Sequence, residues 1–214
     1  LNDLLPPQAD LAAQFGVSRT VVREAVRTLA TKSLLEVRSG SRIAVRSPSA
    51  ESVARSMDLY LRAGRPGFDY ARIHEVRRVL EVEIAGLAAE RRTSEDLERI
   101  DAILREAVGT GGDRERFARC DLAFHASLAR ATQNELFCLL LDAIADTLFE
   151  IRQLAFDVPG TLNRALVHHR AILEQIRLGN PQGARQAMLE DLREAEDIQR
   201  QVPRLHDVRL GVGH

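Results

Sequence analysis

The spacing of hydrophobic residues changes once along the chain. In the first part, apolar residues recur at helical spacing over 6–14 and 19–31, and Gly16 between them tolerates the positive φ of a tight turn. Two short stretches rich in Val and Ile come next, at 34–38 and 42–46, with alternating apolar and polar positions. The order of helix, turn, helix and hairpin predicts a winged helix-turn-helix with a small β wing.

Beyond residue 46 the pattern is helical throughout and gives no strand signal. Ser, Pro and Gly surround a short helical stretch at 50–63, and clusters of Gly, Pro and Asn divide the rest of the chain into longer helices. Six of these are predicted, roughly over 69–91, 94–108, 113–131, 134–156, 160–178 and 181–200. We therefore expect a mainly α protein in four parts: the winged helix-turn-helix over 1–47, a linker with a short helix over 48–68, an all-α six-helix bundle over 69–202, and a tail over 203–214.

Composition and charge narrow the class of protein. Hydrophobic residues make up 45% of the 214, which is enough for a core, and no apolar run reaches the ~18 residues that span a bilayer. Two cysteines are too few for a disulfide scaffold and indicate a reducing compartment, so we expect a cytoplasmic protein without a membrane partner. The formal net charge of -1 conceals a split, because residues 1–50 carry a net +3 and the other 164 a net -4. The basic N-terminal part makes DNA a candidate partner.

The start of the second predicted helix carries side chains suited to DNA. Arg19 and Arg23 are four residues apart and share a face, and arginine both reads guanine and clamps phosphate. Ser18 and Thr20 can donate to phosphates near the helix N-terminus, where the helix dipole favours anions. The wing supplies the remaining candidates, Arg38 and Gly40 at the tip of the hairpin. The alternative is an ordinary basic helix face exposed to solvent.

A resemblance strengthens the DNA-binding interpretation. The segment LPPQADLAAQFGVSRTVVREAVRTL, residues 5–29, resembles the GntR family of bacterial transcription regulators, whose common form is L-P-S-E-R-x-L-A-x-x-x-G-V-S-R-x-x-V-R-E-A-L-x-x-L. The match continues into the wing and covers about forty residues. It implies a double-stranded DNA operator as partner. Ala9 stands where the family has Arg, Arg42 replaces a wing glycine, and the family's first helix has almost no residues here, so we expect the start of the DNA-binding domain to be missing.

Four polar side chains fall on the inward faces of three predicted helices. Asp121 and His125 are one turn apart on a stripe of buried aromatic and aliphatic positions, and His169 and Asp191 occupy similar stripes on two later helices. A carboxylate in a core is costly unless it is paired or bound to a cation. Two carboxylates and two imidazoles in one bundle interior suit a divalent transition metal. The alternative is a metal-free cluster of hydrogen-bonded polar side chains.

A looser resemblance covers about 130 residues of the helical part. Residues 73–81 with 87–93, the D-x-x-x-H motif at 121–125 and the segment 169–173 resemble the FCD ligand-binding domain of the FadR branch of GntR regulators. The resemblance implies a homodimer and metal ligands at the same four positions, with Asp191 standing where metal-binding members usually have a third histidine. Zinc is the expected ion, with nickel or manganese as alternatives. It also implies Arg77 as the residue that holds a small carboxylate effector, although Arg77 could instead form a structural pair with Glu81.

These observations lead to three hypotheses about function. The first is a metabolite-responsive, DNA-binding transcription regulator that is not an enzyme. Repression rather than activation is expected from the family resemblance alone. The second is a metal-dependent hydrolase built on the helical bundle, in which the metal would activate water. The third is a constitutive DNA-binding protein whose helical domain only dimerises.

Overall fold

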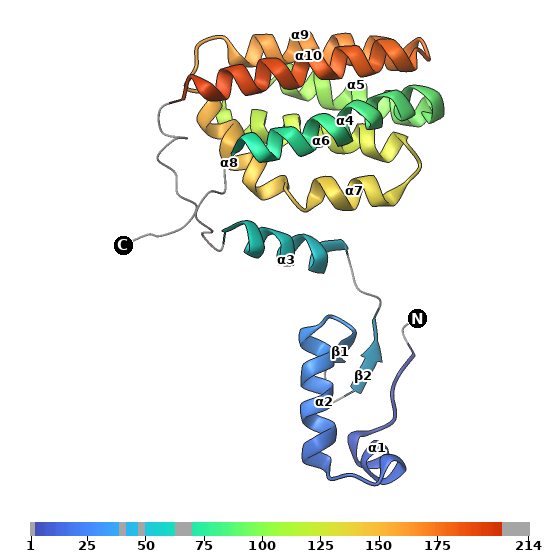
Figure 1. Ribbon diagram of the computed structural model, residues 1–214. Coiled ribbons are helices and arrows are strands. Elements are labelled where there is room, and N and C mark those ends of the chain that lie inside the picture. The colour runs from blue at the N-terminus through green and yellow to red at the C-terminus, as the bar shows by residue number, and fades with distance from the viewer. Residues whose placement is uncertain (1–2, 39–41, 47–49, 63–69, 203–214) are drawn as a thin grey trace. The chain divides into compact units, whose positions relative to one another are not determined.

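The computed structural model describes residues 3–38, 42–46, 50–62 and 70–202 (Figure 1). The chain divides into two compact units, Leu1–Val53 and Ala54–His214. The predicted tail at 203–214 lies outside the described residues. The predicted linker is described in part, because 47–49 and 63–69 also lie outside them while α3 (Ala50–Arg62) is a helix, as expected.

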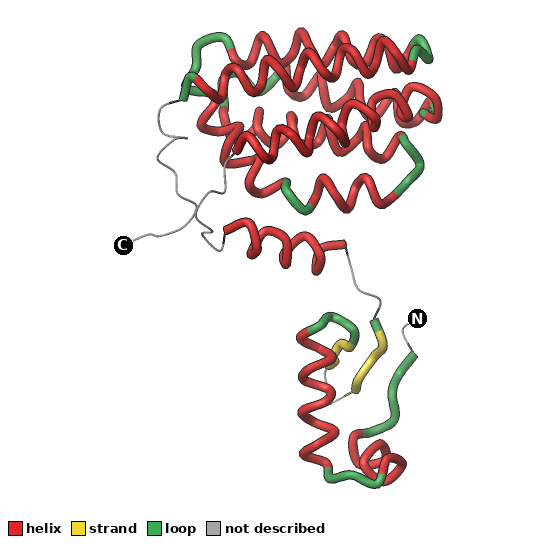
Figure 2. The backbone as a smooth tube through the Cα atoms, in the orientation of Figure 1, coloured by secondary structure: helices red, strands yellow, loops and turns green. Residues whose placement is uncertain are grey.

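The N-terminal unit has the predicted order of elements. These are α1 (Gln8–Phe15), α2 (Arg19–Thr31), β1 (Leu35–Arg38) and β2 (Arg42–Val45). Gly16 adopts the left-handed conformation with φ 63° between the helices, and Ser18 caps α2 by accepting a hydrogen bond from the Val21 backbone N–H at 3.3 Å. The two strands pair in antiparallel fashion with Leu35 opposite Val45 (Figure 2). This confirms the winged helix-turn-helix.

A small apolar core joins the two helices of this unit to the wing. Val22 and Val26 of α2 are buried against Ala12 of α1 and Ile43 of β2. These contacts come from the inward stripe of α2, so the opposite face of the helix is left to solvent. The core therefore fixes α2 by one side and presents its polar side outward.

The C-terminal unit is a helical bundle, as Figure 2 shows. Its helices are α4 (Tyr70–Arg91), α5 (Ser94–Val108), α6 (Arg114–Ala131), α7 (Glu135–Asp142), α8 (Ala145–Ala155), α9 (Thr161–Arg177) and α10 (Pro181–Arg200). The starts of α5, α6 and α10 follow from sequence. Thr93 forms a capping box with Asp96, and Asp113 and Asn180 cap α6 and α10 with side-chain oxygens. Within the described residues, no helix is both long and apolar enough to cross a membrane.

One predicted helix is divided in two. The stretch over 134–156 forms α7 and α8, with the break at Ala143 and Ile144, so seven helices rather than six make up the described bundle. Neither Gly nor Pro stands at the break. The cause is packing, because α7 lies along α6 whereas Leu148 and Ile151 of α8 join a separate apolar cluster with the start of α4. The resulting change of direction decides which α8 side chains reach the bundle interior.

The main core lies where α4, α6, α9 and α10 meet. Its members include Ile84, Phe124, Ile172 and Met188, all of them almost completely buried. The tightest pairings are those of α10 with α4 and with α9. Three of these helices, α6, α9 and α10, carry the four candidate metal ligands, so the apolar core holds the backbone that positions them.

Candidate functional site

The predicted DNA-contacting residues of α2 lie on its solvent-exposed face. Arg19, Thr20 and Arg23 are all exposed, and Arg23 makes a loose contact of 3.8 Å with neighbouring Glu24. The Ser18 hydroxyl oxygen accepts the capping hydrogen bond, and its proton remains available to donate. Two exposed guanidinium groups near the first turn of α2 are thus accessible to a partner.

The wing candidates are only partly described. Arg38 is the last residue of β1, where its backbone faces Arg42 across the hairpin. Gly40 lies outside the described residues. The wing hairpin therefore exists at the predicted place, and the proposed contacts of its tip remain predictions.

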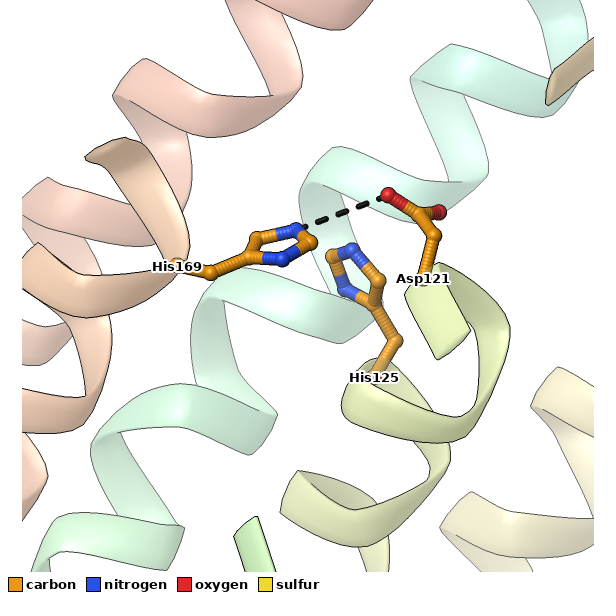
Figure 3. Close-up of side chains that lie close together, drawn as sticks. All are labelled: Asp121, His125 and His169. Carbon is orange, nitrogen blue, oxygen red and sulfur yellow. Dashed lines mark ion pairs between the residues drawn. The ribbon is translucent and has the colours of Figure 1, made fainter. Parts of the chain in front are cut away.

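The four predicted metal ligands meet inside the helical bundle. Asp121 and His125 come from successive turns of α6, His169 from α9 and Asp191 from α10, and each is at most 5% exposed. The His169 Nε2 atom lies 3.5 Å from Asp121 Oδ1 (Figure 3). One candidate ligand atom from each of Asp121, His125 and His169 falls within 4.8 Å of the others.

Asp191 of α10 is the fourth member of this cluster. Its two carboxylate oxygens lie 3.7 Å from His125 Nε2 and 3.7 Å from His169 Nε2. These separations are too long for hydrogen bonds, and both Nε2 atoms and Asp191 Oδ2 lack a hydrogen-bond partner among the described residues. Unpartnered buried donors and acceptors aimed at one another fit a divalent ion between them, with mixed nitrogen and oxygen ligands. The residues therefore fit the metal that the sequence predicts.

Glu81 of α4 borders this cluster on the side of His125. Its Oε2 atom lies 2.6 Å from His125 Nδ1, a close ion-pair contact without the geometry of a hydrogen bond. Its Oε1 atom accepts a hydrogen bond of 2.5 Å from Arg77 Nε. Both Glu81 and Arg77 are almost fully buried. The Arg77–Glu81 pair expected as an alternative is thus present, and sequence reasoning did not link that pair to His125.

Arg152 of α8 is the functional candidate that sequence reasoning missed. Its Nε atom lies 2.6 Å from Asp121 Oδ2, so the guanidinium neutralises a carboxylate inside the bundle. If 134–156 is taken as one continuous helix, helical spacing predicts the wrong inward-facing positions after Ile144, because a separate helix, α8, begins at Ala145. Asp121 keeps its second oxygen directed toward His169.

Burial and charge set the protonation of the two imidazoles in opposite directions. Burial lowers the pKa of His169 to about 4, so this ring is neutral and its nitrogen lone pair is available to a metal. Burial opposes the charging of His125 as well, but Glu81 and then Asp121 and Asp191 raise the pKa of that ring above its usual value. A metal at His125 Nε2 would displace the proton that the three carboxylates attract.

The buried carboxyl groups stay ionised for equally local reasons. Burial opposes ionisation, but Arg77 and then His125 hold the pKa of Glu81 far below its usual range. Arg152, followed by His125 and His169, lowers the pKa of Asp121 in the same way. The interior therefore carries compensated charges, as a buried polar cluster requires.

A cavity of about 160 Å³ opens beside Glu81 and His125. Arg77, Glu81 and His125 form its buried polar wall. Side chains of α6, α7 and α8 form the rest, and all of these are apolar except the exposed carboxylate of Asp142. These are Leu122, Ala123, Ala126, Leu141, Asp142, Ala145 and Leu148. A larger groove of about 690 Å³ runs between α5 and α9, but its acidic groups are already paired with its arginines at the surface. The smaller cavity therefore combines a buried cation with the metal cluster.

Comparisons with known proteins agree with this organisation. Residues 72–194 match the family model of the FCD domain, and residues 1–45 match that of the bacterial regulatory proteins, gntR family. The HTH-type transcriptional regulator LutR of Bacillus subtilis is 33% identical over 92% of this chain and 91% of its own length. The galactonate operon transcriptional repressor of Escherichia coli is 30% identical over 86% of this chain and 82% of its own.

Solved structures lead to the same family. A GntR protein of Streptococcus agalactiae superposes with a TM-score of 0.60 and 27% identity, over 94% of this chain and 90% of that one. The relatives are transcription regulators, so the metal-dependent hydrolase considered above is not the function of this fold. The chain belongs to the GntR family of bacterial regulatory proteins, with a C-terminal FCD domain, and is a transcription regulator rather than an enzyme.

Proposed function

We propose that this protein is a metabolite-responsive repressor of the FadR branch, acting as a homodimer in the cytoplasm. Its helical domain binds a small organic acid beside a divalent metal, and binding alters the affinity of the paired heads for a DNA operator. The single observation that supports this best is the convergence of unpartnered His125 Nε2, His169 Nε2 and Asp191 Oδ2 next to a cavity containing Arg77. An inert dimerisation domain would have no use for such a cluster.

The proposed metal is zinc, with nickel or manganese as alternatives. Asp121, His125, His169 and Asp191 would hold it, and the ion would supply a positive charge at which an effector carboxylate can bind. Imidazole and carboxylate ligands are compatible with all three ions, whereas thiolates, which would favour zinc strongly, are absent from the described cluster. Arg152 would balance the second oxygen of Asp121.

The proposed effector is a short organic acid. The cavity of about 160 Å³ equals roughly five water molecules at ~30 Å³ each, which suits an acid of few carbons. The buried Arg77 guanidinium can clamp a carboxylate from the side opposite the metal, and the apolar walls would accept its carbon chain. The Escherichia coli relative is named for the operon of galactonate, itself an organic acid, which supports this class of signal.

A homodimer is supported by exposed apolar side chains on α4 and α7, two of the helices that line the cavity. Val76 and Val79 of α4 and Leu136 and Leu140 of α7 are between 44% and 68% exposed. Large apolar side chains grouped at a surface commonly mark an interface. A second copy docked on α4 and α7 would lie over helices that contact the effector, so effector binding could change how two heads are spaced along DNA.

Metal analysis of protein purified without a His-tag tests the central claim. We expect about one zinc, nickel or manganese ion per chain, and a lower melting temperature after chelation that metal addition restores. An Asp121→Ala, His125→Ala double variant should lose both the ion and the shift. Protein that carries no ion, and whose melting temperature neither chelator nor added metal changes, would overturn the metal-dependent function and leave only the DNA-binding part.

A further inference from the structure

Glu81 uses both of its carboxylate oxygens on two different functional side chains. Oε1 accepts from Arg77 Nε at 2.5 Å, and Oε2 lies 2.6 Å from His125 Nδ1. Arg77 Nη2 approaches Oε2 as well, at 3.5 Å. Glu81 is 1% exposed, so both oxygens are shielded from bulk solvent. One buried carboxylate therefore touches both the proposed effector-binding cation and a proposed metal ligand.

We propose that Glu81 is a positioning residue that orients His125 for the metal and Arg77 for the effector at the same time. This inference rests on the proposed function, because it takes the metal at Asp121, His125, His169 and Asp191 as its starting point. The Arg77–Glu81 pair alone does not imply this positioning role, and neither do the four proposed ligands alone. The positioning role follows from the contact between Glu81 and His125.

The imidazole ring of His125 offers two nitrogens with different surroundings. A neutral imidazole has one N–H donor and one lone pair, and a carboxylate beside one nitrogen places the proton on that nitrogen. Glu81 Oε2, 2.6 Å from Nδ1, favours the proton on Nδ1 and thus leaves the lone pair on Nε2, which faces Asp191 Oδ2 at 3.7 Å. Neither ring nitrogen has a hydrogen bond of good geometry within the described part of the chain, so the close carboxylate at Nδ1 is what distinguishes the two. Carboxylates in this position commonly raise the metal affinity of a histidine.

The same carboxylate restrains the guanidinium. Without Glu81, the buried Arg77 would be attracted to Asp121 and Asp191, which already act favourably on its charge. An arginine that moved there would occupy oxygens that the metal needs. Glu81 therefore keeps Arg77 at the cavity wall and away from the ligands.

The test compares zinc affinity in variants, measured by competition with a chromophoric chelator. Glu81→Gln keeps the shape of the side chain but has one acceptor oxygen where two donors require one each, so we expect zinc binding about 10- to 100-fold weaker than in the parent protein. The control is Glu83→Gln, which removes an exposed carboxylate two residues further along α4 and should leave zinc affinity unchanged.

A second pair of variants covers the case in which Glu81→Gln fails to fold because Arg77 is left uncompensated. Arg77→Met keeps the carboxylate of Glu81 beside His125 and serves as the reference protein for the double variant, with its own zinc affinity measured beside that of the parent. The double variant Arg77→Met, Glu81→Gln removes the buried charge pair together and should show the same loss, about 10- to 100-fold, relative to Arg77→Met. Equal affinity in these two proteins would overturn the inference.

Nitrogen-15 NMR of the histidine side chains gives a readout that a purely structural role would not change. In the metal-free parent, at a pH high enough for His125 to be neutral, we expect its proton on Nδ1, and in the Arg77→Met, Glu81→Gln protein under the same conditions a mixture of tautomers or of ring orientations. An unchanged tautomer contradicts the inference. If the parent protein binds no zinc at all, the proposed function fails, whereas zinc binding that is indifferent to Glu81 removes this inference alone.

Discussion

At the scale of single residues, His74 links the stability of the helical bundle to pH. Its Nε2 contacts Gln199 Oε1, Nδ1 has no hydrogen-bond partner among the described residues, and the ring is 2% exposed. Burial, and then the Arg77 charge, lower the pKa of His74 to about 4 from 6.5. The folded protein therefore keeps His74 neutral at a pH at which the unfolded chain already binds a proton.

The sign of the pH effect on stability is set by that difference in pKa. As pH falls from about 6.5 to about 4, the unfolded state binds a proton at His74 that the folded state does not bind. The free energy of unfolding therefore drops by up to about 3 kcal/mol. Urea unfolding of the parent and of His74→Leu, with chelator present, isolates this contribution. We expect the parent to lose stability relative to the variant as pH falls through this window. Parallel pH profiles would contradict the assignment.

Asp191 determines how many imidazoles surround the proposed metal. It lies 3.7 Å from both histidine nitrogens, where the family resemblance implies a third histidine. Because imidazole suits zinc and nickel and carboxylate suits manganese, Asp191→His should raise the preference for zinc over manganese, by about tenfold or ~1.4 kcal/mol. Competitive titration with the two ions measures this ratio. Asp197→His, at an exposed position on the same helix, is the control and should leave the ratio unchanged.

At the scale of elements, α2 presents its arginines by burying the opposite side. Val22 and Val26 anchor the helix, and Arg19 and Arg23 remain exposed. Arg19→Ala and Arg23→Ala should each weaken operator binding by about 1–3 kcal/mol and lower the salt dependence of binding, whereas Arg177→Ala on α9 removes the same charge elsewhere and should not. Fluorescence anisotropy with a DNA sequence selected from a random pool provides the measurement. Unchanged affinity in both α2 variants would exclude α2 as the reading helix.

The elements also show how far sequence reasoning reached. Helix starts were predictable because Ser18, Thr93 and Asn180 are local caps, and the inward positions of Asp121, His125, His169 and Asp191 follow from helical spacing. The division of 134–156 was not predictable, since no local residue breaks the helix and the cause is packing between distant segments. Arg152 was missed for the same reason. The Glu81–His125 contact was missed because it joins two helices, α4 and α6, and helical spacing describes one helix at a time.

At the scale of the whole molecule, the proposed metal would join three helices of the bundle. The four ligands come from α6, α9 and α10, so an ion bound by the folded state alone stabilises their packing together. Zinc at about 100 times its dissociation constant should add about 2.7 kcal/mol to the free energy of unfolding. Urea unfolding with and without zinc measures this gain, and His169→Gln should abolish it. A gain that survives in the variant would place zinc elsewhere.

Dimerisation is the property on which the regulator as a whole depends. Two heads that bind neighbouring half-sites combine their affinities, so a monomer should bind an operator far more weakly than a dimer. Val79→Glu and Leu136→Glu place a charge on the exposed apolar faces of α4 and α7, which we expect to favour monomers in analytical ultracentrifugation and to reduce operator affinity at least about tenfold, or ~1.4 kcal/mol.

A matched change separates this interface from a general effect of added charge. Val167→Glu alters an apolar side chain on α9 that is 62% exposed, and it should leave both the dimer and operator binding intact. Zinc affinity should persist in the Val79→Glu and Leu136→Glu proteins, because all four proposed ligands belong to one chain. A dimer that survives both substitutions would mean that the copies meet on another face. The effector would then have to act through some path other than α4 and α7.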